Sequence, residues 1–265
     1  MAKAVGRMPW WGELACVVAA AALAVAGCSA GPSATPEIVY TAPPAADTAG
    51  IGETPTVDTI AITSSAPDNT WTATFKKPVL SGVSDAILTK MNDAITAKVN
   101  GYIHDFTGGS LPGVASGAAP STLEGDFSVA MTSPTIVSLR FSILTTLSGS
   151  GKLVAQPGSI NFWVPTGATV DLSELFTDQK AALSAIAGKA HSGLSTNLGS
   201  TLKWDGKANS LSFFDAWDMT TAGLEFTWAQ GQIADQSAGQ PAVTLPWSDI
   251  KSIIRANGPA GQFEK

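Results

Sequence analysis

The two histidines of this sequence each precede a residue with which they could do chemistry. His104 stands before Asp105, and His191 stands before Ser192. A histidine in hydrogen-bond contact with a serine can activate the hydroxyl as a nucleophile. Adjacent residues on a helix point about 100° apart, so we do not expect His191 and Ser192 to pair with each other. Surface or capping roles are therefore expected for both histidines, and a weak serine esterase with a distant partner stays an alternative.

Two carboxylates flank an aromatic ring near the C-terminus, Asp215 and Asp218 on either side of Trp217. A carboxylate pair beside an aromatic side chain could hydrolyse sugars. Residues three apart on a strand face opposite sides, so solvated acids are expected instead. The segment 149–152 (Gly-Ser-Gly-Lys) lacks the earlier glycine and the following serine or threonine of a phosphate loop, and it indicates a hairpin turn. No catalytic residue is assigned from these features.

Metal and cofactor chemistry has little support in the residue types. The chain has two cysteines and two histidines, and the histidines are far apart in the sequence. No free thiol is expected in the mature protein, for the reasons given below, so neither a metal site nor a cofactor is predicted. Most tryptophans fall on predicted strands, where they should pack in the core. If a ligand binds, we expect it near tryptophans at the loops 107–121 and 230–241.

Cys28 ends a hydrophobic N-terminal segment and is the most informative residue for the cellular location of the protein. Lys3 and Arg7 precede an uncharged apolar run at 14–26, and small residues lead from this run into the cysteine. That order is typical of a secretory signal peptide. The run is shorter than the ~20 residues that a transmembrane helix needs, which favours a signal peptide over a membrane span.

The segment 25–28 (Val-Ala-Gly-Cys) resembles the lipobox of bacterial lipoproteins. In that family the signal peptidase cuts before the cysteine after its thiol has been lipidated. The resemblance implies a signal peptide at 1–27 and acyl chains on Cys28 that hold the protein on the extracytoplasmic face of the cell membrane. Cys16 would leave with the signal peptide. The alternative is an ordinary signal peptide that happens to end near a cysteine.

Residues 28–56 are rich in alanine, proline and threonine and show no sustained apolar period. Such a stretch cannot bury enough surface to offset its ordering entropy, so it is predicted to be a disordered tether. The chain has a formal net charge of −6. This charge argues against a nucleic-acid partner and against attraction to anionic lipid headgroups.

The first predicted elements after the tether are a strand pair and a helix. Two β-branched or aromatic runs, 57–62 and 70–75, are separated by Ala-Pro-Asp-Asn at 66–69, which is turn chemistry. A helix with Ser84 as its expected N-cap follows. Apolar residues recur in it every four positions, which predicts a buried face. The residues of this face are Ile87, Met91, Ile95, Val99 and Ile103.

The rest of the sequence predicts strands around a second helix. Alternating apolar residues indicate half-buried antiparallel strands at 127–131 and 137–143. The Asp171-x-x-Glu174 spacing predicts a helix start, and an apolar repeat from Leu183 to Leu194 continues it. Three strand-like runs and a short terminal helix complete the pattern, at 212–214, 223–228, 242–246 and 248–254.

Strands, a helix between hairpins and no regular βαβ alternation predict an α+β fold with a curved antiparallel sheet and two main packed helices. The folded domain is expected at 57–255. It should begin with a strand-strand-helix lobe at about 57–121 and continue with a larger mixed lobe at 122–255. Residues 256–265 are expected to be a flexible tail.

The buried and exposed faces of the first helix and of the long alternating strand can be predicted residue by residue. Ile95 on the first helix and Leu139 on the long alternating strand are predicted core positions. Their neighbours Lys98 and Arg140 are predicted to face solvent, where truncation to alanine should matter little.

Four stretches resemble the RsiV-type extracytoplasmic domain family. Its C-terminal signature is similar to 223–228 (Gly-Leu-Glu-Phe-Thr-Trp) and 243–251 (Val-Thr-Leu-Pro-Trp-Ser-Asp-Ile-Lys), and another family element is similar to 166–176. A strand-proline-helix lobe at 77–95 resembles the lobe usually paired with it. The resemblance covers roughly 57–255 and implies an α+β fold. That fold is shared, by resemblance, with the non-catalytic lobe of a peptidoglycan deacetylase and with a secreted mycobacterial immunogenic protein.

The sequence departs from that family at the loop after the long strand. Family members have a gly-gly-ala-his motif there, whereas 147–152 keeps glycines and lacks the histidine, so no role of that histidine carries over. Anti-sigma members of the family carry a membrane span and a cytoplasmic region and read out lysozyme binding. This chain is expected to have neither. Lysozyme recognition is expected to be weak or absent, since Tyr40 and Tyr102 are the only tyrosines available as interface anchors.

These observations predict a lipid-anchored binding module of the bacterial cell envelope, without catalytic activity, for a protein or cell-wall partner. Two alternatives remain, a weak serine esterase or hydrolase and a carrier of lipid or glycolipid. A serine hydroxyl within reach of His104 or His191 would favour the esterase. A large internal apolar cavity would favour the carrier.

Overall fold

The computed structural model describes residues 52–109, 111, 113–115, 118–204 and 206–263. All of them belong to one compact unit, Pro43–Lys265. Cys28, the predicted signal peptide at 1–27 and most of the predicted tether lie outside the described residues. Within the described ranges, no helix combines the length and the apolar character that crossing a bilayer requires.

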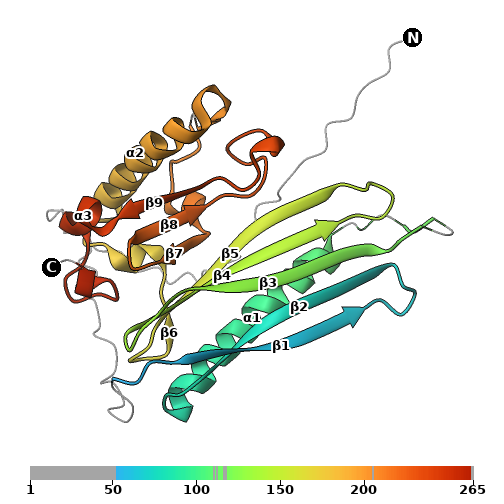
Figure 1. The fold of residues 1–265 in the computed structure, drawn as a ribbon, viewed down its shortest axis with the longest axis horizontal. Helices are drawn as coiled ribbons and strands as arrows, with labels where there is room; N and C mark the ends of the chain where they lie inside the picture. Colours follow the sequence, from blue (N-terminus) through green and yellow to red (C-terminus); the bar gives the residue numbers. More distant parts are fainter. Residues whose placement is uncertain (1–51, 110, 112, 116–117, 205, 264–265) are drawn as a thin grey trace, which may run out of the picture. The chain divides into compact units, whose positions relative to one another are not determined.

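The described residues form an α+β fold with a curled six-stranded sheet and a second, three-stranded sheet, as Figure 1 shows. The larger sheet has the order β1-β2-β3-β4-β5-β6, and the smaller has the order β7-β8-β9. The strands of the larger sheet are β1 (Thr56–Ser65), β2 (Trp71–Ser81), β3 (Ser121–Thr132), β4 (Ile136–Thr146), β5 (Leu153–Trp163) and β6 (Ala168–Thr169). Those of the smaller sheet are β7 (Trp217–Met219), β8 (Gly223–Thr227) and β9 (Ala242–Pro246).

One pair in the larger sheet differs from the expected antiparallel arrangement. β2 and β3 run parallel, with Trp71 opposite Ser121, while the other neighbouring pairs are antiparallel. Parallel neighbours need a long crossover connection. Helix α1 (Asp85–Gly108) is that connection, and it packs against β2.

Helix α1 buries most of the face that its four-residue period predicts, although Ile103 at the end of that face is only partly buried. Its buried residues are Ile87, Met91, Ile95, Val99 and Phe106. Ser84 is the N-cap residue, as expected, but its side chain makes no capping hydrogen bond. The predicted hairpin before this helix is confirmed too, since β1 pairs with β2 and Asn69 has a positive φ of 55° in the turn.

The core under α1, here called the α1 core, joins the helix face to the inner face of the large sheet. Two glycines let large rings approach that sheet. A Cβ on Gly125 would lie 2.0 Å from the ring of Phe75, and one on Gly158 would lie 1.9 Å from the Tyr102 hydroxyl. The buried members include Phe75, Met91, Ile95, Val99, Val137, Leu139, Phe141, Ile143 and Phe162.

The smaller sheet packs with α2 (Gln179–Leu198) in a second cluster, here called the C-terminal core. Asp178 caps α2, and its Oδ1 accepts hydrogen bonds from the Lys180 and Ala181 backbone nitrogens at 2.8 and 3.0 Å. The helix buries Ala182, Ile186, Ala190 and Leu194. Aromatic rings fill the space below it, among them Phe214, Phe226 and Trp228.

Three local predictions are wrong. The run 212–214 lies in a 3₁₀ helix, η3 (Leu211–Phe214), because a short apolar run does not by itself distinguish strand from helix. The Asp171-x-x-Glu174 spacing does form a capping box, but it opens the 3₁₀ helix η1 (Leu172–Leu175) rather than α2. Val129, expected on a half-buried face, is 44% exposed beside an irregularity in the β3–β4 register.

The two cores do not coincide with the two predicted lobes, and the C-terminal residues differ from the predicted tail. β3, β4 and β5 share a sheet with β2, so the α1 core extends past residue 121, while Ile136 of β4 belongs to the C-terminal core. Residues 256–263 are packed, although a flexible tail was expected there. Ala260 is fully buried, and the Phe263 ring stacks on Trp247 at 4.1 Å. A further terminal helix, α3 (Trp247–Ile250), agrees with the prediction.

Candidate functional site

The outer face of the large sheet meets strand β7 through polar side chains. β7 pairs with β8 on one side only, so backbone groups on its other edge need partners. Ser159 Oγ accepts a hydrogen bond from the Trp217 nitrogen at 3.0 Å, and Ser138 Oγ accepts one from the Met219 nitrogen at 3.0 Å. Asn161 Nδ2 donates to the Trp217 carbonyl at 2.9 Å. β4 and β5 therefore satisfy the free edge of β7 with side chains in place of a backbone ladder.

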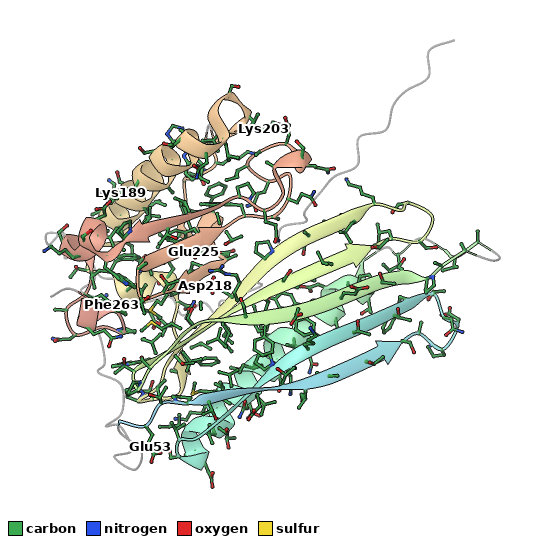
Figure 2. All side chains as sticks on the ribbon, in the orientation of Figure 1. Glu53, Lys189, Lys203, Asp218, Glu225 and Phe263 are labelled. Carbon is green, nitrogen blue, oxygen red and sulfur yellow. The ribbon has the colours of Figure 1, made fainter. Side chains whose placement is uncertain are left out.

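An ion-paired arginine reinforces this contact. Arg140 Nε lies 2.6 Å from Asp218 Oδ2, and its Nη1 lies 2.7 Å from Glu225 Oε1. Figure 2 shows Asp218 and Glu225 on the small sheet, on the side toward the large one. We call these contacts, with those of Ser138, Ser159 and Asn161, the polar junction.

The polar junction corrects two predictions. Arg140 was expected to face solvent, but its side chain is only 30% exposed, and Asp218, expected to be solvated, is 2% exposed. Burial is the largest influence on Asp218 and raises the pKa of its carboxyl to about 6, although the Arg140 charge acts in the opposite direction. Asp215, by contrast, is exposed as predicted. The alternating pattern identified the outward-facing positions of β4 and did not reveal that another sheet covers them.

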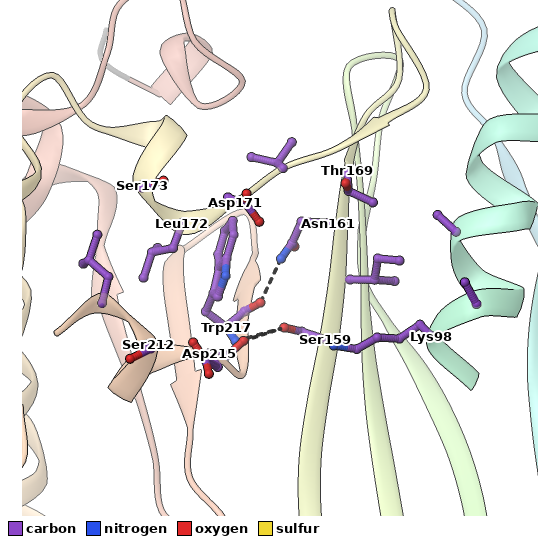
Figure 3. A pocket seen from close by; sticks show the side chains of 15 residues that line it. Lys98, Ser159, Asn161, Thr169, Asp171, Leu172, Ser173, Ser212, Asp215 and Trp217 are labelled. Atoms are coloured by element: carbon purple, nitrogen blue, oxygen red, sulfur yellow. Dashed lines mark hydrogen bonds between the residues drawn. The ribbon is translucent and has the colours of Figure 1, made fainter. Parts of the chain in front are cut away.

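A cleft of about 630 Å³ opens beside the polar junction. Its lining comes from four separate parts of the chain, which are α1, β5, the segment through η1 and the segment from η3 to β7. In Figure 3, Ser159 and Asn161 of β5 meet Trp217 through hydrogen bonds at the floor of the cleft. The floor is thus fixed by the contacts that join the two sheets.

Charged groups stand on opposite walls of the cleft. Lys98 extends from α1 toward Ser159, and Asp215 lies on the wall beyond η3 (Figure 3). Partial burial raises the pKa of Asp215, and the positive charge of Lys98 opposes that rise. Lys98 and Asp215 make no ion pair within 4.0 Å in the described part of the chain. The two groups therefore influence each other across the open space.

The histidines lie away from this cleft. His104, near the end of α1, is highly exposed, with its Nδ1 3.8 Å from Asp105 Oδ1. On α2, His191 has its Nε2 3.5 Å from Ser195 Oγ and its ring centroid 5.7 Å from that of Trp204. The sequence reasoning considered Ser192 and missed Ser195, although a spacing of four on a helix could have indicated it.

Other predicted features can be placed as well. The segment 149–152 belongs to a turn, with Gly149 and Gly151 at φ of 72° and 58°. Among the described residues, no group of three His, Cys, Asp or Glu side chains could hold a metal ion. The cleft does not form at the loops 107–121 or 230–241, where a ligand was expected, although one tryptophan, Trp217, does line it.

Neither a protein-family model nor a curated protein sequence matches the chain. Solved structures do match. A DUF3298 family protein from Bacteroides fragilis has a TM-score of 0.56 at 10% identity, covering 81% of this chain and 99% of its own. A DUF3298 family protein from Pseudomonas aeruginosa has a TM-score of 0.53 at 14% identity, covering 76% and 95%. The described chain therefore has the fold seen in these distant bacterial DUF3298 family structures.

Proposed function

We propose that this protein is a non-catalytic binding module, held by acyl chains on Cys28 at the extracytoplasmic face of a bacterial cell membrane, for a protein or cell-wall partner. We also propose that it is an RsiV-type domain, on the basis of the sequence motifs at 166–176, 223–228 and 243–251.

The cleft beside the polar junction is the observation that carries the binding role. Its floor is fixed before any partner arrives, because Ser159 and Asn161 are already bonded to β7. A preformed floor reduces the entropy lost on binding. The lining combines apolar surface from Leu172 and Ile160 with charged and hydroxyl groups, a mixture typical of ligand sites.

A sedimentation assay with purified peptidoglycan sacculi tests the role in cell-wall binding, using the full-length protein in detergent. Ala97 is exposed and lines the cleft, so Ala97→Trp should fill the cleft and abolish co-sedimentation. Ala86 is also exposed on α1 and does not line the cleft, so Ala86→Trp is the matched control and should sediment like the wild type. A pull-down from envelope extract with the same variants covers a protein partner. Equal behaviour of the two variants in both assays would contradict the assignment of the cleft.

Anchoring at Cys28 is tested separately. Cys28→Ala should abolish acylation and release the protein or leave an uncleaved precursor. A single acyl chain binds membranes only marginally, so the mature N-terminus should carry at least two. Mass spectrometry that finds a free thiol at Cys28, or cleavage elsewhere, would overturn the proposed location.

A serine hydrolase is the second candidate, because Ser195 lies near His191. The 3.5 Å separation exceeds the 2.6 to 3.2 Å expected for a nucleophile and its base. Within the described residues, no carboxylate forms an ion pair with His191 to orient it. Hydrolysis of p-nitrophenyl acetate that Ser195→Ala abolishes would establish this candidate over the binding module.

The other partners considered are less well supported. The cleft is lined by lysine, aspartate and serine side chains as well as apolar ones, unlike the apolar cavity that a lipid carrier needs. Lysozyme, the partner implied by the RsiV-type resemblance, should bind weakly or not at all. Calorimetry that gives a dissociation constant at or below about 1 μM, some −8 kcal/mol, would overturn that expectation.

A further inference from the structure

The cleft contains a carboxylate whose surroundings suggest a specific ligand chemistry. Asp215 makes no side-chain hydrogen bond or ion pair with any described residue, although its surroundings partly desolvate it. An accessible carboxylate that no described side chain pairs can accept hydrogen bonds from a ligand. A cationic ammonium group is the strongest such donor.

A cation faces this carboxylate from the opposite wall. Lys98 Nζ lies 5.5 Å from the centroid of the Tyr102 ring and makes no ion pair with any described carboxylate. It is free to bind an anionic group that enters between α1 and β5. Lys98 and Asp215 therefore present charges of opposite sign from the two walls. A second carboxylate, Asp171, also lines the cleft, but it belongs to the capping box of η1.

The space between these charges suits a short chain with polar and apolar groups. Ala94 and Ala97 leave room along α1, and Leu172 supplies apolar surface across from them. The Thr169 and Ser173 hydroxyls also line the cleft. Hydroxyl groups can bind amide groups of a peptide as donors or acceptors.

We propose that the cleft binds a short peptide that carries both a free ammonium and a free carboxylate, the ammonium on Asp215 and the carboxylate on Lys98. This inference rests on the proposed binding function and names the ligand class of the same site. Cell-wall stem peptides and the termini of protein partners share this chemistry.

Calorimetry of the full-length protein in detergent with the tripeptide L-Ala-γ-D-Glu-meso-diaminopimelate tests the proposal. We expect saturable binding that acetylation of the amino groups, or amidation of the carboxylates, weakens at least tenfold, about 1.4 kcal/mol. Asp215→Asn should weaken the native tripeptide equally and should cause no further loss for the acetylated one. Lys98→Met should likewise weaken binding of the native tripeptide about tenfold and should cause no further loss for the amidated one. Asp93→Asn, an exposed acid on α1 that does not line the cleft, is the control.

The outcomes separate this proposal from the binding function itself. Absence of binding, or binding that the acetylated and amidated tripeptides retain within about twofold, overturns the zwitterionic ligand. If sacculi or an envelope protein are still retained through the cleft in that case, the proposed function stands alone. An all-L tripeptide with free termini distinguishes the two sources, since equal affinity for it favours a protein terminus and a tenfold preference for the stem peptide favours the cell wall.

Discussion

Strand β4 has two faces that are buried in different ways. Toward α1 it presents Val137, Leu139 and Phe141, which are almost fully buried among apolar side chains. Toward the small sheet it presents Ser138 and Arg140, which are held by hydrogen bonds and ion pairs. The first face belongs to a dry core and the second to the polar junction, although the same alternating sequence produces both.

The comparison shows how one sheet can contribute an apolar core on one face and fix the floor of the cleft on the other. Apolar packing is non-directional and sets no unique contact between groups. Hydrogen bonds at the polar junction are directional, and they hold β7 and Trp217 at fixed positions under the cleft. We infer that the α1 core supplies most of the stability, whereas the polar junction sets the geometry of the cleft.

The largest effect should come from the α1 core. Ile95→Ala and Leu139→Ala each remove a fully buried side chain, so each should reduce the free energy of unfolding by about 2 to 5 kcal/mol in urea denaturation. Lys98→Ala, an exposed position on the same helix, should change it by no more than about 0.5 kcal/mol. Equal losses at Ile95 and Lys98 would mean that the buried face of α1 is misassigned.

Loss of the arginine in the polar junction should have the next largest effect. Arg140→Ala leaves Asp218 buried without its cation, so we expect a loss of about 3 kcal/mol at pH 7. The sequence alone predicted that Arg140→Ala would have little effect on stability, and the buried ion pair overturns that prediction. Lys76→Ala breaks an exposed ion pair with Asp126 on the same sheet and should cost about 0.5 kcal/mol or less. Equal losses in the free energy of unfolding for the two variants would show that burial does not make the Arg140–Asp218 ion pair more important than the Lys76–Asp126 pair.

Stability should depend on pH through Asp218. Its folded pKa of about 6 exceeds the value of about 4 in an unfolded chain, so the folded state binds this proton more tightly. The resulting stability is fully present below about pH 4 and is lost as the pH rises through 6. Between pH 4.5 and 7.5 the wild type should therefore lose on the order of 2 kcal/mol more than Asp218→Asn, measured by urea unfolding.

The matched control for this titration is Asp126→Asn, which removes an exposed carboxylate whose pKa is lowered by Lys76. It should leave the decline between pH 4.5 and 7.5 as steep as in the wild type. A wild-type profile as flat as that of Asp218→Asn would show that Asp218 is not the titrating group.

The smallest effect should come from a single junction hydroxyl. Ser159→Ala leaves the buried Trp217 backbone nitrogen without its acceptor and should cost about 1 to 2 kcal/mol. Ser142→Ala, at an exposed position of neighbouring β4, should be close to neutral. A neutral Ser159→Ala variant would show that the hydrogen bond contributes little to holding β7.

Sequence periodicity predicted the α1 core well, because a helix stripe and an alternating strand each mark the residues that share a face. It could not identify what covers the opposite face of β4, so the ion pair that holds Arg140 to the buried Asp218 was missed. The parallel pairing of β2 and β3 was missed for a similar reason, since strand partners are set by contacts far apart in the chain. The cleft depends on four distant segments, and no local pattern links Lys98 with Asp215.

Hydrogen exchange with soluble muropeptides tests most directly whether binding is confined to the cleft beside the polar junction. In full-length protein, amides at 94–98, 159–161, 169–173 and 211–217 should exchange more slowly when muropeptides are present. Amides at 87–91, in the same helix but away from the cleft, should be unchanged. Slower exchange that is confined to other segments, or no change at saturating muropeptide, would contradict the account.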